Sequence, residues 1–139
     1  MPELKPAAKA PMKVLLVEPE AMLRRTVALT ARSLGMADVY EAASTAAGQR
    51  MLYERAFQGA VIAVDCAPAG KPTDLSLLDE VRKGGTASDR AIPIAVLAEQ
   101  CSAEFLQALL QREIKRVILK PFRAKLLLEA FAELAAAKK

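Results

Sequence analysis

The sequence predicts an α/β fold, a doubly wound five-stranded parallel sheet with five helices on its two faces. Three short apolar runs, KVLLV at 13–17, GAVIAV at 59–64 and IPIAVLA at 92–98, have the near-continuous hydrophobicity of strands buried on both faces. Weaker runs at 37–42 and 115–120 complete a set of five. Segments with helical spacing separate the runs, and this strict alternation of strand and helix gives an open parallel sheet.

The first and last helices are predicted from the spacing of their apolar residues. A helix over 20–34 ends where Gly35 can adopt the left-handed conformation that terminates helices. The fifth helix is expected to begin after Pro121. The residues expected to face the core are Leu23, Val27, Thr30 and Leu34 in the first helix, and Phe122, Leu126, Ala130, Phe131 and Leu134 in the fifth.

The three middle helices are predicted from polar residues that can cap their first turns. Two glycines at 84–85 are expected to end the third helix. The expected caps and approximate last residues are Ser44 and Arg55 for the second helix, Thr73 or Asp74 and Lys83 for the third, and Ser102 and Arg112 for the fourth.

Length and composition restrict the class of protein. The 139 residues are enough for one domain, expected at 13–139 after a short leader at 1–12. Apolar residues make up 53% and charged residues 26%, the usual mix of a folded globular protein. No apolar run is long enough to span a bilayer, and the leader lacks the apolar core of a secretory signal. We therefore expect a cytoplasmic protein without a membrane partner.

The cysteines and the lack of histidine exclude several kinds of site. Cys66 and Cys101 are too few for a disulfide scaffold and favour a reducing compartment. They are read as inert core or loop residues, with a redox pair as the alternative. The sequence contains no histidine, which removes the commonest zinc ligand and every Ser-His or Cys-His nucleophile pair. Most hydrolase mechanisms are thereby excluded.

Charged residues mark the carboxyl ends of three predicted strands. Glu18 ends the first strand, Asp65 the third and Lys120 the fifth, while the fourth ends at Ala98. In an open parallel sheet, functional groups collect at the edge formed by the carboxyl ends of the strands. Two acids and a lysine are therefore expected to converge there.

This arrangement resembles the receiver domain of bacterial response regulators, the CheY-like family. The matching features are the acidic end of the first strand, Asp65 after the third, and KPF at 120–122 after the fifth. The resemblance covers nearly the whole chain after the leader. It implies the strand order 2-1-3-4-5 and a role in two-component signal transduction.

The resemblance also implies a role for each residue of the site. Asp65 is the expected phosphoacceptor, which receives a phosphoryl group from a histidine kinase or a phosphotransfer protein. Lys120 is expected to lie beside Asp65 and contact the phosphoryl group, and its bond to Pro121 to be cis, as in the family. Mg²⁺ would be held by Glu18 and Asp65, with Glu20 as a further possible ligand.

Three departures from the family pattern weaken this site. In VEPE at 17–20, the second acidic position falls on Pro19, which has no side-chain oxygen. Ala98 replaces a Ser or Thr hydroxyl, and Val117 replaces the aromatic residue that reorients in the family. These changes predict weak Mg²⁺ binding and a pseudo-receiver that acts by protein contact. A normally phosphorylated relay receiver is one alternative.

Basic residues near the carboxyl terminus suggest another alternative. They are expected on the face of the fourth helix, fifth strand and fifth helix, which partners contact in the family. An effector that binds an anionic ligand there, such as a cyclic dinucleotide or an acidic protein, is therefore possible. The net charge is only +4, so DNA binding is not expected. The residues of this face are Arg112, Lys115, Arg116, Arg123 and Lys125.

The remaining expectations concern activity and assembly. An enzyme that uses Glu18, Glu20 and Asp65 as acid–base groups is the least supported class, because no further catalytic cluster accompanies them. No catalysis is expected beyond self-phosphorylation at Asp65. We expect a downstream protein target and a monomer or weak homodimer.

Overall fold

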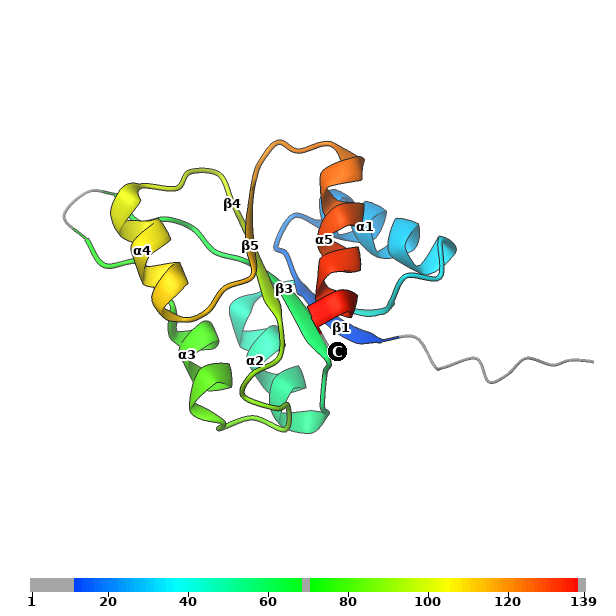
Figure 1. Ribbon diagram of the computed structural model, residues 1–139, viewed down its shortest axis with the longest axis horizontal. Helices are drawn as coiled ribbons and strands as arrows, with labels where there is room; N and C mark the ends of the chain where they lie inside the picture. The colour runs from blue at the N-terminus through cyan, green and yellow to red at the C-terminus, as the bar shows by residue number, and fades with distance from the viewer. Residues whose placement is uncertain (1–11, 69–70, 138–139) are drawn as a thin grey trace, which may run out of the picture.

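The structure is a computed structural model that describes residues 12–68 and 71–137. The predicted leader lies outside this range except for Met12. Five strands form one sheet in the order β2-β1-β3-β4-β5, and all neighbouring strands are parallel (Figure 1). The predicted fold class and strand order are confirmed.

The elements alternate along the chain as predicted, and each strand agrees with its predicted run to within two residues at either end. In chain order they are β1 (Lys13–Val17), α1 (Ala21–Ser33), β2 (Asp38–Ala42), α2 (Thr45–Glu54), β3 (Gly59–Ala63), α3 (Ser76–Lys83), β4 (Ile94–Ala98), α4 (Ala103–Gln111), β5 (Arg116–Leu119) and α5 (Ala124–Ala137).

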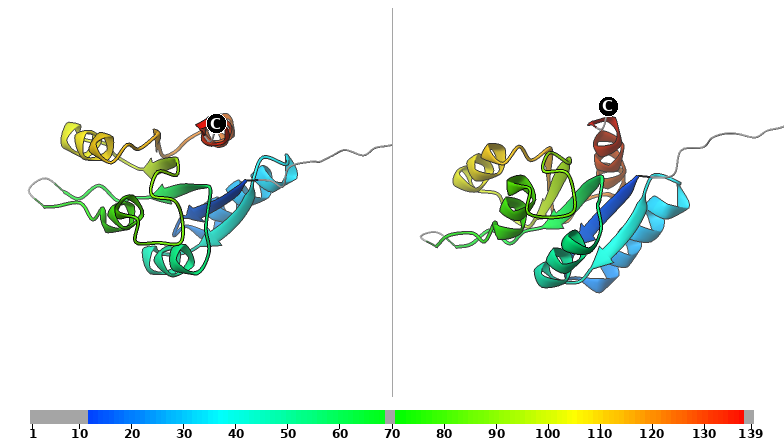
Figure 2. Two further views of the ribbon diagram at one scale, coloured as in Figure 1. Left: turned by 60° about the horizontal axis from the view of Figure 1, so that its bottom comes forward. Right: turned by 90° about the horizontal axis from the view of Figure 1, so that it is seen from below.

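The core forms two layers of buried side chains, one on each face of the sheet. Helices lie over both faces (Figure 2). Successive residues of a strand point to opposite faces, so Val14 and Leu16 of β1 join one layer and Leu15 and Val17 the other. Helices α1 and α5 cover the first layer, while α2, α3 and α4 cover the second. Both faces of β1 are therefore dry, which explains its unbroken apolar run.

The core-facing side of α1 differs from the prediction. Its buried residues are Val27, Ala28 and Ala31, whereas Leu34 is 59% exposed. Leu34 is the C-cap residue and lies beyond the last helical turn, so the helical spacing no longer applies to it. Alanines at the contact allow the helix to lie close to the sheet.

Helix α5 is also rotated slightly from the predicted orientation. Leu127, Ala130, Phe131 and Leu134 are buried, at the spacing of a helix stripe, whereas Leu126 is 38% exposed. The helix begins three residues after Pro121, and this start places Leu127 rather than its neighbour toward the sheet.

The predicted caps are confirmed for α2 and α4. The hydroxyl of Ser44 accepts a hydrogen bond from the Ala47 N–H, and that of Ser102 accepts one from the Phe105 N–H, both at 3.0 Å. Gly84 ends α3 with a φ of 81°. The start of α3 differs from the prediction.

At the start of α3, the N-cap position is Leu75, which has no capping side chain. Asp74 still accepts a hydrogen bond from the Ser76 N–H at 3.0 Å. Thr73 instead accepts one from the Ala67 N–H, within the loop that precedes the helix.

Candidate functional site

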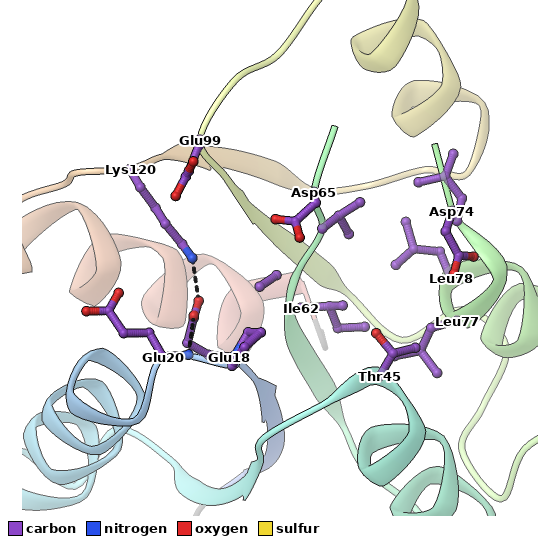
Figure 3. Close-up of a pocket in the computed structure, with 14 residues that line it drawn as sticks. Glu18, Glu20, Thr45, Ile62, Asp65, Asp74, Leu77, Leu78, Glu99 and Lys120 are labelled. Atoms are coloured by element: carbon purple, nitrogen blue, oxygen red, sulfur yellow. Dashed lines mark hydrogen bonds and ion pairs between the residues drawn. The ribbon is translucent and has the colours of Figure 1, made fainter. Parts of the chain in front are cut away.

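The strand ends meet at one edge of the sheet, as predicted. Glu18 follows β1 and Lys120 follows β5 directly, while Asp65 lies two residues beyond β3. The parallel register pairs Val17 with Ile62 and Ala98 with Leu119, so the residues that follow these strands lie at the same level of the sheet. Together they line a cavity of about 380 Å³ (Figure 3).

Glu18 and Lys120 form an ion pair at the base of this cavity. Glu18 is 1% exposed, and its Oε1 lies 2.7 Å from Lys120 Nζ. The approach is off the hydrogen-bonding direction, so the contact is mainly Coulombic. Glu18 Oε2 accepts a hydrogen bond from the Glu20 N–H at 2.9 Å. Both carboxylate oxygens therefore have a partner from the chain itself.

The backbone around Glu18 is fixed as well. Its N–H donates to the Ala42 carbonyl at 3.0 Å, and its own carbonyl accepts a hydrogen bond from Arg24 Nη1 at 2.9 Å. Arg24 also contacts Glu41 of β2 at 3.3 Å. Contacts from α1 and β2 thus hold the residue whose carboxylate binds Lys120.

Asp65 lies across the cavity and is exposed. Within residues 12–68 and 71–137, no hydrogen bond or ion pair of its carboxylate is found. The structure pairs Lys120 with Glu18 and not with Asp65, which differs from the expectation. A buried carboxylate gains most from a cation, because burial without one is costly, whereas water already solvates Asp65.

The predicted Mg²⁺ ligands do not assemble into a metal site. The two oxygens of Glu18 are engaged by Lys120 and by the Glu20 backbone, and Pro19 offers none. In Figure 3, the Glu20 carboxylate points away from Asp65. In the part of the chain that the structure describes, no cluster of three or more acidic, cysteine or histidine side chains has a geometry that could hold a metal ion. The residues present therefore do not fit the octahedral oxygen site that Mg²⁺ requires.

Two further acids line the cavity and were not singled out from the sequence. Asp74 lies before α3, and Glu99 follows β4 directly. Glu99 also lines an adjoining groove between the start of α1 and Phe122. Glu99 could have been found from its position directly after the fourth strand, one residue beyond Ala98. The cavity wall carries more carboxylates than cations, which opposes the approach of an anion.

Ala98 and Val117 lie on the two strands at the β5 edge of the sheet. Ala98 is buried at the end of β4 and offers no hydroxyl to the cavity. Val117 lies in β5, partly buried against the core layer under α3 and α4. The Lys120–Pro121 bond is cis, as the resemblance implied.

The predicted basic face is divided by ion pairs. Arg112 contacts Asp79 of α3 at 2.6 Å, and Arg116 contacts Glu133 of α5 at 3.0 Å and Glu129 at 3.5 Å. These two arginines are therefore largely committed to neighbouring helices. The exposed basic residues that remain are Lys115, Arg123 and Lys125.

The fold was compared with those of known proteins. Neither a protein-family sequence model nor a curated protein sequence matches the chain. Among solved structures, it resembles the chemotaxis protein CheY4 of Vibrio cholerae, with a TM-score of 0.75 and 23% identity over 90% of this chain and 99% of that one. The chain has the receiver-domain fold.

Further solved structures share this receiver fold. The receiver domain of the Francisella response regulator 1452 matches with a TM-score of 0.72 and 20% identity, over 92% of this chain and 99% of that one. NtrX from Brucella abortus matches with a TM-score of 0.72 and 21% identity, over 91% of this chain but only 27% of the NtrX chain. None of the helices in the described ranges is long and apolar enough to cross a membrane.

Proposed function

We propose that this protein is a receiver module of two-component signal transduction that acts through protein–protein contact and does not depend on phosphorylation. The Glu18–Lys120 ion pair carries this proposal. Within the chain, it pairs the carboxylate that would otherwise bind a metal ion with the ammonium that would otherwise contact a phosphoryl group.

Phosphoryl transfer to Asp65 would meet three obstacles. The new negative charge would be added to a wall that already includes Glu99 and Asp74. Among the described residues, no assembled Mg²⁺ site offsets that charge, and Lys120 would have to leave the buried Glu18 to do so. Ala98 provides no hydroxyl for a phosphoryl oxygen. Each obstacle raises the free energy of the phosphorylated state, and we propose that Asp65 is a poor phosphoacceptor.

The partners proposed for this module are proteins. A histidine kinase or phosphotransfer protein and a downstream target are the partners that the fold suggests, in the cytoplasm. The exposed side chains of Lys115, Arg123 and Lys125 favour an acidic protein surface. An anionic nucleotide effector has less support, because Arg112 and Arg116 are already paired with acids. We propose neither DNA binding nor an enzymatic activity.

The test is intact-mass measurement after incubation with Mg²⁺ and acetyl phosphate, a small phosphodonor. We expect slow and substoichiometric phosphorylation, with any label lost in Asp65→Asn. Ala98→Thr, which places a hydroxyl at the end of β4, should increase the label. Complete phosphorylation of the unmodified chain within minutes would instead establish a relay receiver and overturn the proposal.

A further inference from the structure

Helix α1 lies beside β2, the strand at one edge of the sheet (Figure 2). It contains three arginines and no acidic residue. All three arginines contact the same carboxylate of β2. Arg25 Nη1 lies 2.7 Å from Glu41 Oε2, and Arg24 Nε lies 3.3 Å from Oε1 of the same residue. Arg32 Nη1 lies 3.5 Å from Glu41 Oε2.

The neighbouring elements add no acid to this cluster among the residues that the structure describes. Successive residues of a strand point to opposite faces, so Asp38 lies on the face of β2 away from Glu41. Glu20 lines the cavity and the groove at the other side of the helix start. On α5, Glu129 and Glu133 are paired with an arginine of β5. Three guanidinium groups therefore share one carboxylate, which leaves two positive charges unbalanced.

The three arginines differ in how much of each is available to a partner. Arg24 is mostly buried and also donates to the Glu18 carbonyl, so it braces α1 against the sheet. The side chains of Arg25 and Arg32 are 56% and 39% exposed. A guanidinium has five N–H donors, and in the described ranges Arg25 uses one of them. One arginine suffices to balance Glu41, so the other two hold donors in place toward solvent.

Two apolar side chains lie in the same exposed stripe of α1. Met22 is 78% exposed and Leu29 is 52% exposed. The positions 22, 25, 29 and 32 follow the three- and four-residue spacing that places side chains on one side of a helix. Apolar and cationic residues therefore alternate along about 15 Å of helix surface. The buried residues of α1 lie on a different side, toward the sheet.

We propose that this stripe, formed by Met22, Arg25, Leu29 and Arg32, is a docking surface for an acidic amphipathic segment of a partner protein. The carboxylates of the segment pair with the two exposed guanidinium groups, whose planar forks match carboxylate geometry. Its apolar side chains cover Met22 and Leu29. These two apolar residues favour a protein over a nucleic acid, whose backbone presents charged phosphates to such a surface.

The stripe is separate from the surfaces discussed above. It lies along β2 at one edge of the sheet, whereas Lys115, Arg123 and Lys125 lie near β5 at the other edge. It includes no residue that lines the cavity around Asp65. Docking at the stripe therefore does not depend on phosphorylation, and its failure would leave the proposed function untouched.

The test uses the full chain and a displayed library of random peptides of about 12 residues, which span about 18 Å as a helix. Selection on the unmodified chain follows counter-selection on Arg25→Gln/Arg32→Gln, so that surviving peptides require the stripe. We expect survivors rich in Asp or Glu and in large apolar residues. A selection without survivors, or with survivors that are not acidic, would overturn the proposal.

Fluorescence anisotropy with a synthesised survivor measures the contribution of each residue. Arg25→Gln/Arg32→Gln should weaken binding at least about ten-fold, as the loss of charge-assisted hydrogen bonds requires. Leu29→Ser should weaken it several-fold. The matched control, Arg123→Gln/Lys125→Gln, removes the same charge at the β5 edge and should have little effect. Equal losses in the two double variants would refute the location of the surface.

Nuclear magnetic resonance on the unmodified chain decides the question even if a variant folds poorly. The peptide should shift the Nε–H signals of Arg25 and Arg32 and the methyl signals of Met22 and Leu29. Shifts confined to α4, β5 and α5 would overturn the proposal. So would duplex DNA or phosphatidylserine vesicles that bind this stripe more tightly than the peptide does, because the partner would then belong to another class.

Discussion

Glu18 and Asp65 are carboxylates at the exits of adjacent parallel strands, yet their surroundings differ completely. Glu18 is 1% exposed and is held by Lys120 and by the Glu20 N–H. Asp65 is exposed and projects into the cavity from the other side (Figure 3). The lysine at the end of β5 has both acids within the same cavity and contacts the buried one.

This difference shows that burial, rather than the chemical type of the acid, decides with which carboxylate the lysine forms an ion pair. An exposed carboxylate is already solvated, so a salt bridge adds little to its stability. A buried carboxylate without a cation would cost several kcal/mol. On the basic face, partly buried Arg112 is paired with Asp79, whereas exposed Lys125 is not expected to contribute to folding.

The largest expected effect comes from removing the cation of the buried pair. Lys120→Met should lower the free energy of unfolding by about 2–4 kcal/mol, because it leaves the Glu18 charge buried without a partner. Asp65→Asn should change it by less than about 0.5 kcal/mol, as for an exposed position. Urea denaturation of both variants provides the comparison, and equal effects would show that burial does not distinguish the two acids.

A smaller loss of stability is expected when the comparison of a paired with an exposed residue is repeated on the basic face, with Arg112 and Lys125. Arg112→Glu should lower the free energy of unfolding by about 1–2 kcal/mol, because it removes the bond to Asp79 and introduces a like charge. Lys125→Glu reverses the same charge at an exposed position and should cost less than about 0.5 kcal/mol. Thermal unfolding of the two variants measures both losses of stability. Equal losses would contradict the comparison.

Magnesium should stabilise the protein very little. A site with a dissociation constant above about 10 mM adds less than about 0.3 kcal/mol at roughly 5 mM Mg²⁺. Pro19→Asp returns a carboxylate beside Glu18 and should raise the stabilisation toward about 1 kcal/mol, as a dissociation constant near 1 mM requires. Melting with and without Mg²⁺ measures both. A marked stabilisation of the unmodified chain would mean that Lys120 releases Glu18 to the metal.

The smallest effect is expected for beryllofluoride, which mimics a phosphoryl group on an aspartate. A ligand shifts a conformational equilibrium only by its differential interaction with the two states. Ala98 lacks the hydroxyl, and Val117 the ring, that would carry such a difference to the surface. Amide chemical shifts in α4 and β5 should therefore barely change. Large changes there would show that a group bound at Asp65 does alter the structure of α4 and β5.

The fold was predictable because its signals are local and repeated. Apolar runs buried on both faces, polar caps such as Ser44 and Ser102, and Gly84 at a helix end each specify their own element. Where the prediction failed, as for Leu34 and Leu126, the phase of a helix near its end depended on where that helix begins or stops.

The composition of the site was predictable, but its pairing was not. Residues at strand ends converge in any parallel sheet, so the positions of Glu18, Asp65 and Lys120 followed from the topology. Which acid the lysine contacts depends on relative burial, which a linear sequence does not reveal. Pro19 and Ala98 could be recognised from the sequence as positions without a side-chain oxygen. Glu99 was missed because it lies one position past the predicted strand end.

The most direct test of the central claim is a pair of double-mutant cycles that share Lys120→Met. One cycle combines it with Glu18→Gln and the other with Asp65→Asn, and urea denaturation gives the free energy of unfolding of each variant. We expect a coupling energy of about 2 kcal/mol between Glu18 and Lys120, and less than about 0.5 kcal/mol between Asp65 and Lys120. A larger coupling to Asp65 than to Glu18 would contradict the account, because Lys120 would then pair with the exposed acid rather than the buried one.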